Sequence, residues 1–212
     1  MSGAPIFYGN HLSGHSYKVA LLLALLGIEA EYRHVNLALP HAERPQAFRE
    51  SNFFEEVPVL QHGTRTFCQS NVILLYLAET YGGYLGNSAE DKWRILEWLS
   101  WETNRIGFSV SNLRFAYRFA RNRDDGAIVF LRGRALKDLA RMEQHLKGHD
   151  FLIGERPTIA DIASCGYLFW ADEAHLDIRQ WPATTAWLHR IRDLPRWATP
   201  EILLAKERSV LY

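Results

Sequence analysis

Two short segments contain residues that together could hold a small peptide-like anion. The first is Val57-Pro58, where proline lacks a backbone N–H and so belongs at the start or edge of a strand. The bond before Pro58 can be cis at little cost, and the amide and carbonyl of Val57 would then face outward toward an extended peptide. The second is Gln69-Ser70, where Ser70 is the expected N-cap of an apolar-periodic helix. The unpaired amides and partial positive charge of a helix start suit a carboxylate.

The neighbouring sequence predicts the elements that position these segments. A short strand over residues 4–9, a buried helix over 17–26 and an alternating strand over 31–37 indicate a parallel strand pair with a right-handed crossover. A short helix near residues 44–50 follows. Two strands around a turn at His62-Gly63 then lead to the helix that starts near Ser70. The predicted order is β-α-β-α-β-β-α, an α/β thioredoxin-like domain over residues 1–82.

The chain from residue 88 to 212 predicts an all-helical domain. Apolar residues recur at helical spacing from Ala89 to Leu146, with a break expected at residues 123–126, and a further helix is expected over 183–192. Thr158 and Asp161 have the spacing of a capping box at the start of another helix. We therefore expect these two residues to stabilise the fold and to take no part in catalysis.

Composition excludes several classes of function. The 24 Lys and Arg residues balance the 24 Asp and Glu residues, so no net charge attracts nucleic acid or an anionic membrane. No apolar run reaches the roughly 18 residues that a membrane span needs, and the first residues do not resemble a signal peptide. The two cysteines, Cys68 and Cys165, form no CxxC motif and are expected to be buried thiols. We expect a cytoplasmic protein without a metal, a nucleic-acid partner or a membrane partner.

The sequence VPVL at residues 57–60, followed by QSN-x-IL-x-YLA from residue 69, resembles the glutathione transferase family. The resemblance implies the two-domain fold of that family, with glutathione as cosubstrate and no metal. It implies that Val57, before a cis Pro58, pairs with the cysteinyl backbone of glutathione. It also implies that Gln69 and Ser70 hold the γ-glutamyl end. Serine-using classes such as theta, delta and nu are the ones that this chain resembles.

The resemblance further implies a hydroxyl group that activates the thiol near the start of the first helix. Ser13 falls at the position of the catalytic serine in the theta, delta and zeta classes. Tyr8 is the alternative, because a tyrosine near the end of the first strand has this role in other classes. We prefer Ser13, since Tyr8 lies within the predicted strand. Ser16 is expected to be a plain N-cap.

Several features depart from the family pattern, and the residue before Val57 is the one that bears most on glutathione binding. Where the family often has Lys, Gln or His to hold the glycine carboxylate, this chain has Glu56, with Glu55 beside it. A carboxylate there should repel the glycine carboxylate unless a cation such as His41 or Arg44 compensates. His41 lies within one residue of the histidine that the family usually has in this loop.

The favoured function is the addition of glutathione to a small hydrophobic electrophile or a peroxide, with Ser13 as hydrogen-bond donor to the thiolate. One alternative is a disulfide reductase that uses two glutathiones, as in the nu class. Another is a non-catalytic binding protein of the same fold, which the acidic pair Glu55-Glu56 motivates. Phe54 lies where mu-class enzymes insert an aromatic side chain into the partner subunit, and the alternative is that it packs under its own domain. A homodimer is expected.

Overall fold

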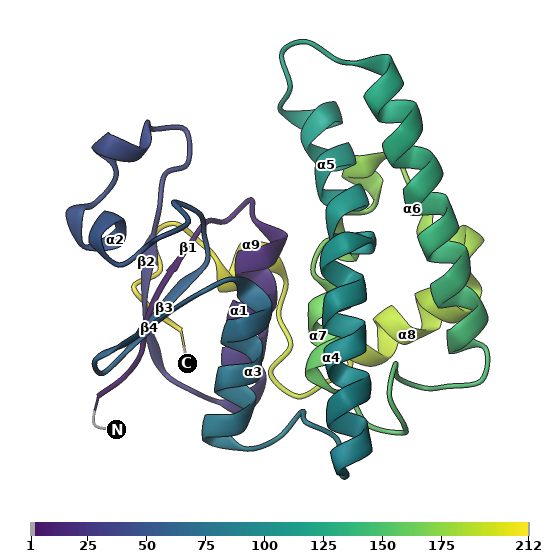
Figure 1. The fold of residues 1–212 in the computed structure, drawn as a ribbon, viewed down its shortest axis with the longest axis horizontal. Coiled ribbons are helices and arrows are strands. Elements are labelled where there is room, and N and C mark those ends of the chain that lie inside the picture. Colours follow the sequence, from purple (N-terminus) through teal and green to yellow (C-terminus); the bar gives the residue numbers. More distant parts are fainter. Residues whose placement is uncertain (1–2, 212) are drawn as a thin grey trace. The chain divides into compact units, whose positions relative to one another are not determined.

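The computed structural model describes residues 3–211, which fall into two compact units (Figure 1). One unit contains the chain up to Gly83 together with the chain from Leu194 onward, and the other runs from Tyr84 to Asp193. The first unit contains a sheet and helices, whereas the second is helical. The predicted fold class, a thioredoxin-like α/β domain followed by a helical domain, is therefore confirmed.

A five-stranded sheet forms the centre of the α/β unit, with its strands in the order β4-β3-β1-β2-β5. The β1–β2 pair is parallel, whereas the β1–β3, β3–β4 and β2–β5 pairs are antiparallel. The elements of this unit are β1 (Ile6–Gly9), α1 (Gly14–Leu26), β2 (Ala30–His34), the 3₁₀ turn η1 (His41–Glu43), α2 (Gln46–Glu50), β3 (Val59–His62), β4 (Arg65–Cys68), α3 (Ser70–Tyr81), α9 (Pro200–Leu203) and β5 (Val210–Leu211).

Different helices cover the two faces of the sheet. Helices α1 and α3 pack against each other on one face (Figure 1). On the other face, Tyr8 packs with Val35, Val59 and Phe48 of α2. Successive residues of a strand point to opposite faces, so Phe7 and Tyr8 can both be buried. The loops that follow β1 and precede β3 therefore emerge from a sheet that is packed on both sides.

The first helix begins earlier than the sequence predicts. It starts at Gly14, where Tyr17 was the expected first residue, because Ser13 is the cap: its Oγ accepts a hydrogen bond from the N–H of Ser16 at 3.1 Å. The expectation that Ser16 is the N-cap is wrong. The helix ends at Gly27, whose left-handed backbone (φ 68°) suits a glycine.

The end of the chain also differs from the prediction. The sequence predicts a helical domain that continues to residue 212, but the chain from Leu194 onward belongs to the α/β unit. There α9 contacts α1, and β5 pairs antiparallel with β2. A two-residue strand is too short to show an alternating pattern, which explains why the sequence does not reveal it.

The helical unit has one more break than the sequence predicts. Arg105 leaves the helical conformation (φ −120°, ψ −100°) and separates α4 from α5, in addition to the later break that was expected. No helix among residues 3–211 combines the length and the apolar character needed to cross a membrane. The elements of this unit are α4 (Ala89–Asn104), α5 (Ile106–Arg118), α6 (Asp125–Leu146), α7 (Ile159–Cys165), α8 (Pro182–Arg192) and the 3₁₀ turns η2 (Leu168–Trp170), η3 (Asp172–Ala174) and η4 (Ile178–Gln180).

The capping box at the start of α7 is present and buried. Oδ2 of Asp161 accepts hydrogen bonds from the N–H and the hydroxyl of Thr158 at 2.8 and 3.2 Å. Oδ1 accepts from the N–H of Leu152 and from the indole N–H of Trp187, both at 2.8 Å. One carboxylate therefore ties α7 both to the loop before it and to α8, which is a structural arrangement.

Candidate functional site

The backbone of Val57 is open to a ligand. The Val57–Pro58 peptide bond is cis. Within residues 3–211, neither the N–H nor the C=O of Val57 makes a hydrogen bond. The residue before it is held in place, because Nδ2 of Asn52 donates to the carbonyl of Glu56 at 2.7 Å. A positioned donor and acceptor are therefore available to the main chain of an extended peptide.

The start of α3 is open as well. The sequence predicts Ser70 as the N-cap, but Ser70 is the first helical residue and Gln69 occupies the cap position. Gln69 has a φ of 71° and makes no side-chain hydrogen bond to the helix. The N–H of Ser70 consequently has no intrahelical partner, and an uncapped helix start of this kind attracts an anion.

The hairpin of β3 and β4 brings the free backbone of Val57 close to the start of α3. Val59 lies opposite Cys68 in the ladder, so the segment that leaves β4 runs beside the segment that enters β3. A side-chain contact shows the same proximity, since Oε2 of Glu56 accepts a hydrogen bond from Nε2 of Gln69 at 3.3 Å. The open backbone at Val57, the helix start and an exposed carboxylate thus form one surface with both donors and acceptors.

Ser13 has a hydroxyl proton that it does not use within the described part of the chain. It is 9% exposed, and its Oγ accepts from the N–H of Ser16 without donating to any group of residues 3–211. Its own N–H donates to the carbonyl of Asn10 at 3.0 Å. A serine hydroxyl can donate one hydrogen bond while it accepts others, so Ser13 can still donate to an anion such as a thiolate.

Tyr8, by contrast, uses its hydroxyl inside the protein. Its side chain is 1% exposed. The hydroxyl donates to Oε1 of Gln61 at 3.3 Å and accepts from Nη1 of Arg33 at 2.9 Å. A buried phenol with both of these partners is poorly placed to meet a ligand, which favours Ser13 over Tyr8.

Two basic residues lie near the acidic pair, and both contact Glu55. Nδ1 of His41 lies 3.5 Å from Oε1 of Glu55, and Nη1 of Arg44 donates to the carbonyl of Glu55 at 3.0 Å. Nε2 of His41 is buried and has no hydrogen-bond partner among the described residues. Glu55 therefore lies next to the imidazole of His41 and the guanidinium of Arg44, whereas Glu56 lies next to Gln69.

Cys68, at the end of β4, is half-buried and is not set up as a nucleophile. Its Sγ lies 3.8 Å from both the carbonyl of Ser51 and Oδ1 of Asn52. Burial raises the pKa of the Cys68 thiol, so the reactive thiolate is disfavoured.

Two buried asparagines, to which the sequence analysis assigned no role, hold the loops of the site. Asn10 accepts from the N–H of Leu12 and donates to the carbonyl of Val35, both at 2.8 Å. Asn52 holds the loop before β3, as described above. An asparagine directly after a strand is a recognisable signal for an Asx turn, whereas the contact of Asn52 depends on the folded loop.

Models of a known family match both units. A model for the N-terminal domain of glutathione S-transferases matches residues 7–85, and a model for the C-terminal domain of glutathione S-transferases matches residues 120–195. A solved glutathione S-transferase from Xanthobacter autotrophicus is 31% identical with a TM-score of 0.83, and the alignment covers 92% of this chain and 96% of that one. This chain belongs to the glutathione S-transferase family.

Proteins similar to this glutathione S-transferase family member carry more than one functional name. A structure from Rhodopseudomonas palustris, described as a possible glutathione S-transferase, is 31% identical with a TM-score of 0.84 over 94% of this chain and 90% of that one. The disulfide-bond oxidoreductase YfcG of Escherichia coli is 25% identical over 205 residues, which is 94% of each chain. The family is therefore established, while its members here carry the names of more than one reaction.

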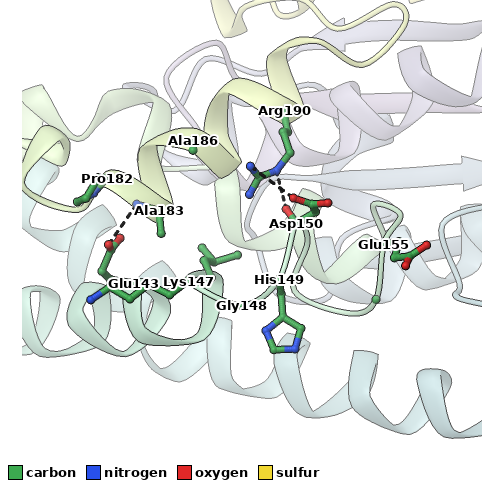
Figure 2. A pocket seen from close by; sticks show the side chains of 12 residues that line it. Glu143, Lys147, Gly148, His149, Asp150, Glu155, Pro182, Ala183, Ala186 and Arg190 are labelled. Carbon is green, nitrogen blue, oxygen red and sulfur yellow. Dashed lines mark hydrogen bonds and ion pairs between the residues drawn. The ribbon is translucent and has the colours of Figure 1, made fainter.

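The helical unit of this family member has a separate pocket of about 760 Å³, between the end of α6, the loop after it and α8 (Figure 2). Its charged side chains are largely bound within the protein. Glu143 accepts from the N–H groups of Ala183 and Thr184 at the start of α8, and Nε of Arg190 donates to the carbonyl of Asp150. A carboxylate that caps a helix is not free for acid–base chemistry, so the candidate site remains in the α/β unit.

Proposed function

We propose that this protein is a glutathione-dependent transferase whose α/β unit binds glutathione. The observation that carries this proposal is the free backbone of Val57 beside the open helix start at Ser70. The cysteinyl main chain of glutathione pairs with Val57 next to Pro58, and the γ-glutamyl carboxylate accepts from the N–H of Ser70. Contacts of this kind recognise a peptide backbone, so they favour a tripeptide thiol over a thiol without amide groups.

The charges of the γ-glutamyl end fit the same surface. This end of glutathione has an α-ammonium as well as an α-carboxylate, because its peptide bond is made through the side chain. Gln69 and Glu56 present acceptor oxygens next to the helix start, and Glu56 adds a negative charge for the ammonium. This proposal differs from the sequence-based expectation that Glu56 repels the glycine carboxylate. At the glycine end, the relevant acid is instead Glu55, whose Oε1 lies 3.5 Å from Nδ1 of His41.

Ser13 is the proposed hydrogen-bond donor to the glutathione thiolate. Lowering a thiol pKa from about 8.5 by ~2 units requires about 2.7 kcal/mol of preferential stabilisation of the anion. A hydrogen bond to a charged group contributes about 1.5–3 kcal/mol and a helix start about 0.3–1 kcal/mol, so Ser13 at the start of α1 is sufficient. The thiolate population at neutral pH rises about 25-fold, but the reactivity of each thiolate falls about 8-fold. Most of the rate therefore comes from holding the thiolate against its electrophile.

The proposed reaction joins the thiolate sulfur to a small hydrophobic electrophile or attacks a peroxide. Similarity to YfcG over 94% of both chains favours one second candidate, a disulfide reductase. In that reaction the thiolate of one glutathione attacks the disulfide and releases one substrate thiolate. A second glutathione then resolves the mixed disulfide and gives glutathione disulfide and the second thiol. Turnover of wild-type protein with an aryl halide and with a dialkyl disulfide distinguishes the two candidates.

We also propose that the protein is a homodimer. Phe53 is 88% exposed, and it contacts Phe54 edge to face with 5.0 Å between the ring centroids. A pair of exposed aromatic rings is unfavourable in water, and such rings are typical anchors of protein interfaces. Sedimentation velocity of the full chain measures the oligomeric state directly.

Calorimetric titration with glutathione tests the proposed function. Heat of binding is expected, and its absence at millimolar glutathione refutes the proposal. Ser13→Ala should then lower kcat about tenfold or more, since the thiolate loses its charged hydrogen bond. Ser13 is also an N-cap, so the matched control is Ser88→Ala, which removes the N-cap of α4 in the helical unit. Equal kcat values for the two variants would exclude Ser13 as the donor.

A further inference from the structure

Two histidines meet beside the loop that carries Ser13. Nδ1 of His11, in the loop after β1, lies 3.0 Å from Nε2 of His34 at the end of β2. Both side chains are half-buried, and their ring centroids are 5.1 Å apart. At this separation one ring nitrogen must donate the shared proton and the other must accept it. One ring is therefore the donor and the other the acceptor, and the neighbouring groups determine which is which.

Asn10 determines which ring is the acceptor. Its Oδ1 accepts from the N–H of Leu12 and its Nδ2 donates to the carbonyl of Val35, so the orientation of the amide group is fixed by both partners. The same Nδ2 lies 3.4 Å from Nε2 of His34. Since an amide nitrogen can only donate, Nε2 of His34 is the acceptor for Asn10 and for His11. His34 then carries its ring proton on Nδ1.

The same asparagine connects His34 to Ser13. The carbonyl of Asn10 accepts from the N–H of Ser13 at 3.0 Å, and its N–H donates to Oγ of Ser16 at 3.1 Å. The N–H of Ser16 in turn donates to Oγ of Ser13. A displacement of Asn10 therefore alters both the backbone and the hydroxyl of Ser13.

A proton on Nε2 of His34 would destabilise this hydrogen-bonded arrangement. The new N–H would face the N–H groups of Asn10 and His11, and no acceptor would remain between them. Burial lowers the pKa of His34, and the nearby His11 and Lys206 lower it further, whereas Glu207 raises it. The form of His34 that accepts is consequently the form that prevails at neutral pH.

We propose that His34 is a positioning residue, which acts through Asn10 to hold the loop of Ser13 in its working geometry only while Nε2 of His34 is unprotonated. The consequence for catalysis rests on the role proposed above for Ser13. The predicted change in the loop when His34 gains a proton does not depend on that role, and it can be measured separately.

Nuclear magnetic resonance of ¹⁵N-labelled protein tests the effect on the loop without any substrate. At neutral pH, His34 should be the tautomer with its proton on Nδ1. On acidification, the amide signals of Ser13 and Ser16 should shift with the midpoint of His34. These shifts should disappear in His34→Gln, whose side-chain oxygen can accept in place of Nε2 and does not titrate. Shifts that persist in His34→Gln, or signals that do not follow the His34 midpoint, overturn the proposal.

Turnover provides a second readout. Relative to wild type at neutral pH, His34→Gln should keep kcat within about twofold and lose the decline that wild type shows at the His34 midpoint. His34→Phe has no acceptor, so its kcat should be about tenfold lower at every pH. The matched control is His149→Gln, which alters a different histidine pair, the stacked rings of His145 and His149 in the helical unit. Glutathione affinity should be unchanged in all three variants.

These results separate the two proposals. A wild-type protein that binds no glutathione refutes the proposed function, and the resonance experiment still decides the role of His34. An active wild-type enzyme whose acidic decline is unchanged in His34→Gln overturns the role of His34 and leaves the proposed function in place.

Discussion

The buried carboxylate of Asp161 allows a loss of stability to be calculated from the structure. Its side chain is fully buried, and the variant Asp161→Ala removes the acceptor from three buried N–H groups, those of Leu152, Thr158 and the Trp187 indole. A buried donor without a partner costs about 1–3 kcal/mol. Three such donors set a lower limit of about 3 kcal/mol, and removal of one partner from a buried charged network typically costs about 3–5 kcal/mol. The expected loss of unfolding free energy is therefore roughly 3–5 kcal/mol, which exceeds the ~1 kcal/mol of an ordinary exposed cap.

A loss of roughly 4 kcal/mol should lower the melting temperature of a chain of this size by about 8–16 °C. Urea denaturation followed by tryptophan fluorescence measures the free energy, and scanning calorimetry measures the melting temperature. Asp161→Asn retains one acceptor oxygen, so its loss should be smaller than that of Asp161→Ala. The matched control is Asp172→Ala, an exposed carboxylate of the same unit, which should change stability by less than about 0.5 kcal/mol. A loss of only ~1 kcal/mol in Asp161→Ala would show that the donors find other partners and would refute this reasoning.

Three further variants test other parts of the structure. Glu56→Gln should weaken glutathione binding about two- to fivefold in calorimetry, the size of an exposed ion pair, and should leave the affinity for N-acetylglutathione unchanged. Tighter glutathione binding would instead place Glu56 at the glycine end. Tyr8→Phe should keep kcat within about twofold, and a loss as large as that of Ser13→Ala would transfer the role to Tyr8. Asp138 is buried, its Oδ2 has no hydrogen-bond partner within residues 3–211, and burial raises its pKa, so ionisation at rising pH destabilises the folded wild type. Asp138→Asn should therefore gain stability relative to wild type between pH ~4 and neutral pH in urea denaturation, and a constant difference would contradict this.

The sequence suffices to bring the two segments of the proposed glutathione site close together, because short-range features place them. Val57-Pro58 and Gln69-Ser70 flank one hairpin, so the local signals of turn, strand and helix start suffice to place them together. The cap of α1 could not be predicted in the same way. Ser13 and Ser16 are both acceptable N-caps, and the choice depends on Asn10, whose side chain is fixed by Val35, the residue directly after β2.

Contacts between distant segments account for the remaining differences. His11 and His34 are separated by 23 positions and meet because β1 and β2 are parallel, so that their ends reach the same edge of the sheet. The sequence predicts the parallel pairing of the two strands. The approach of the two rings depends on loop geometry, which the periodicity of apolar residues does not describe. The neighbours of Glu56 likewise depend on the conformation of its loop, and its contact with Gln69 is not visible in the sequence pattern.

The return of the chain to β2 has a consequence for synthesis and for engineering. The residues that supply α9 and β5 follow the whole helical unit, so one edge of the sheet lacks its last partner until the segment after Leu194 has been synthesised. A fragment that stops after Gly83 would expose the unpaired edge of β2, and exposed edges of this kind promote aggregation. Excision of the α/β unit therefore calls for a short linker that joins residue 83 to residue 194, so that the terminal strand stays in the same polypeptide.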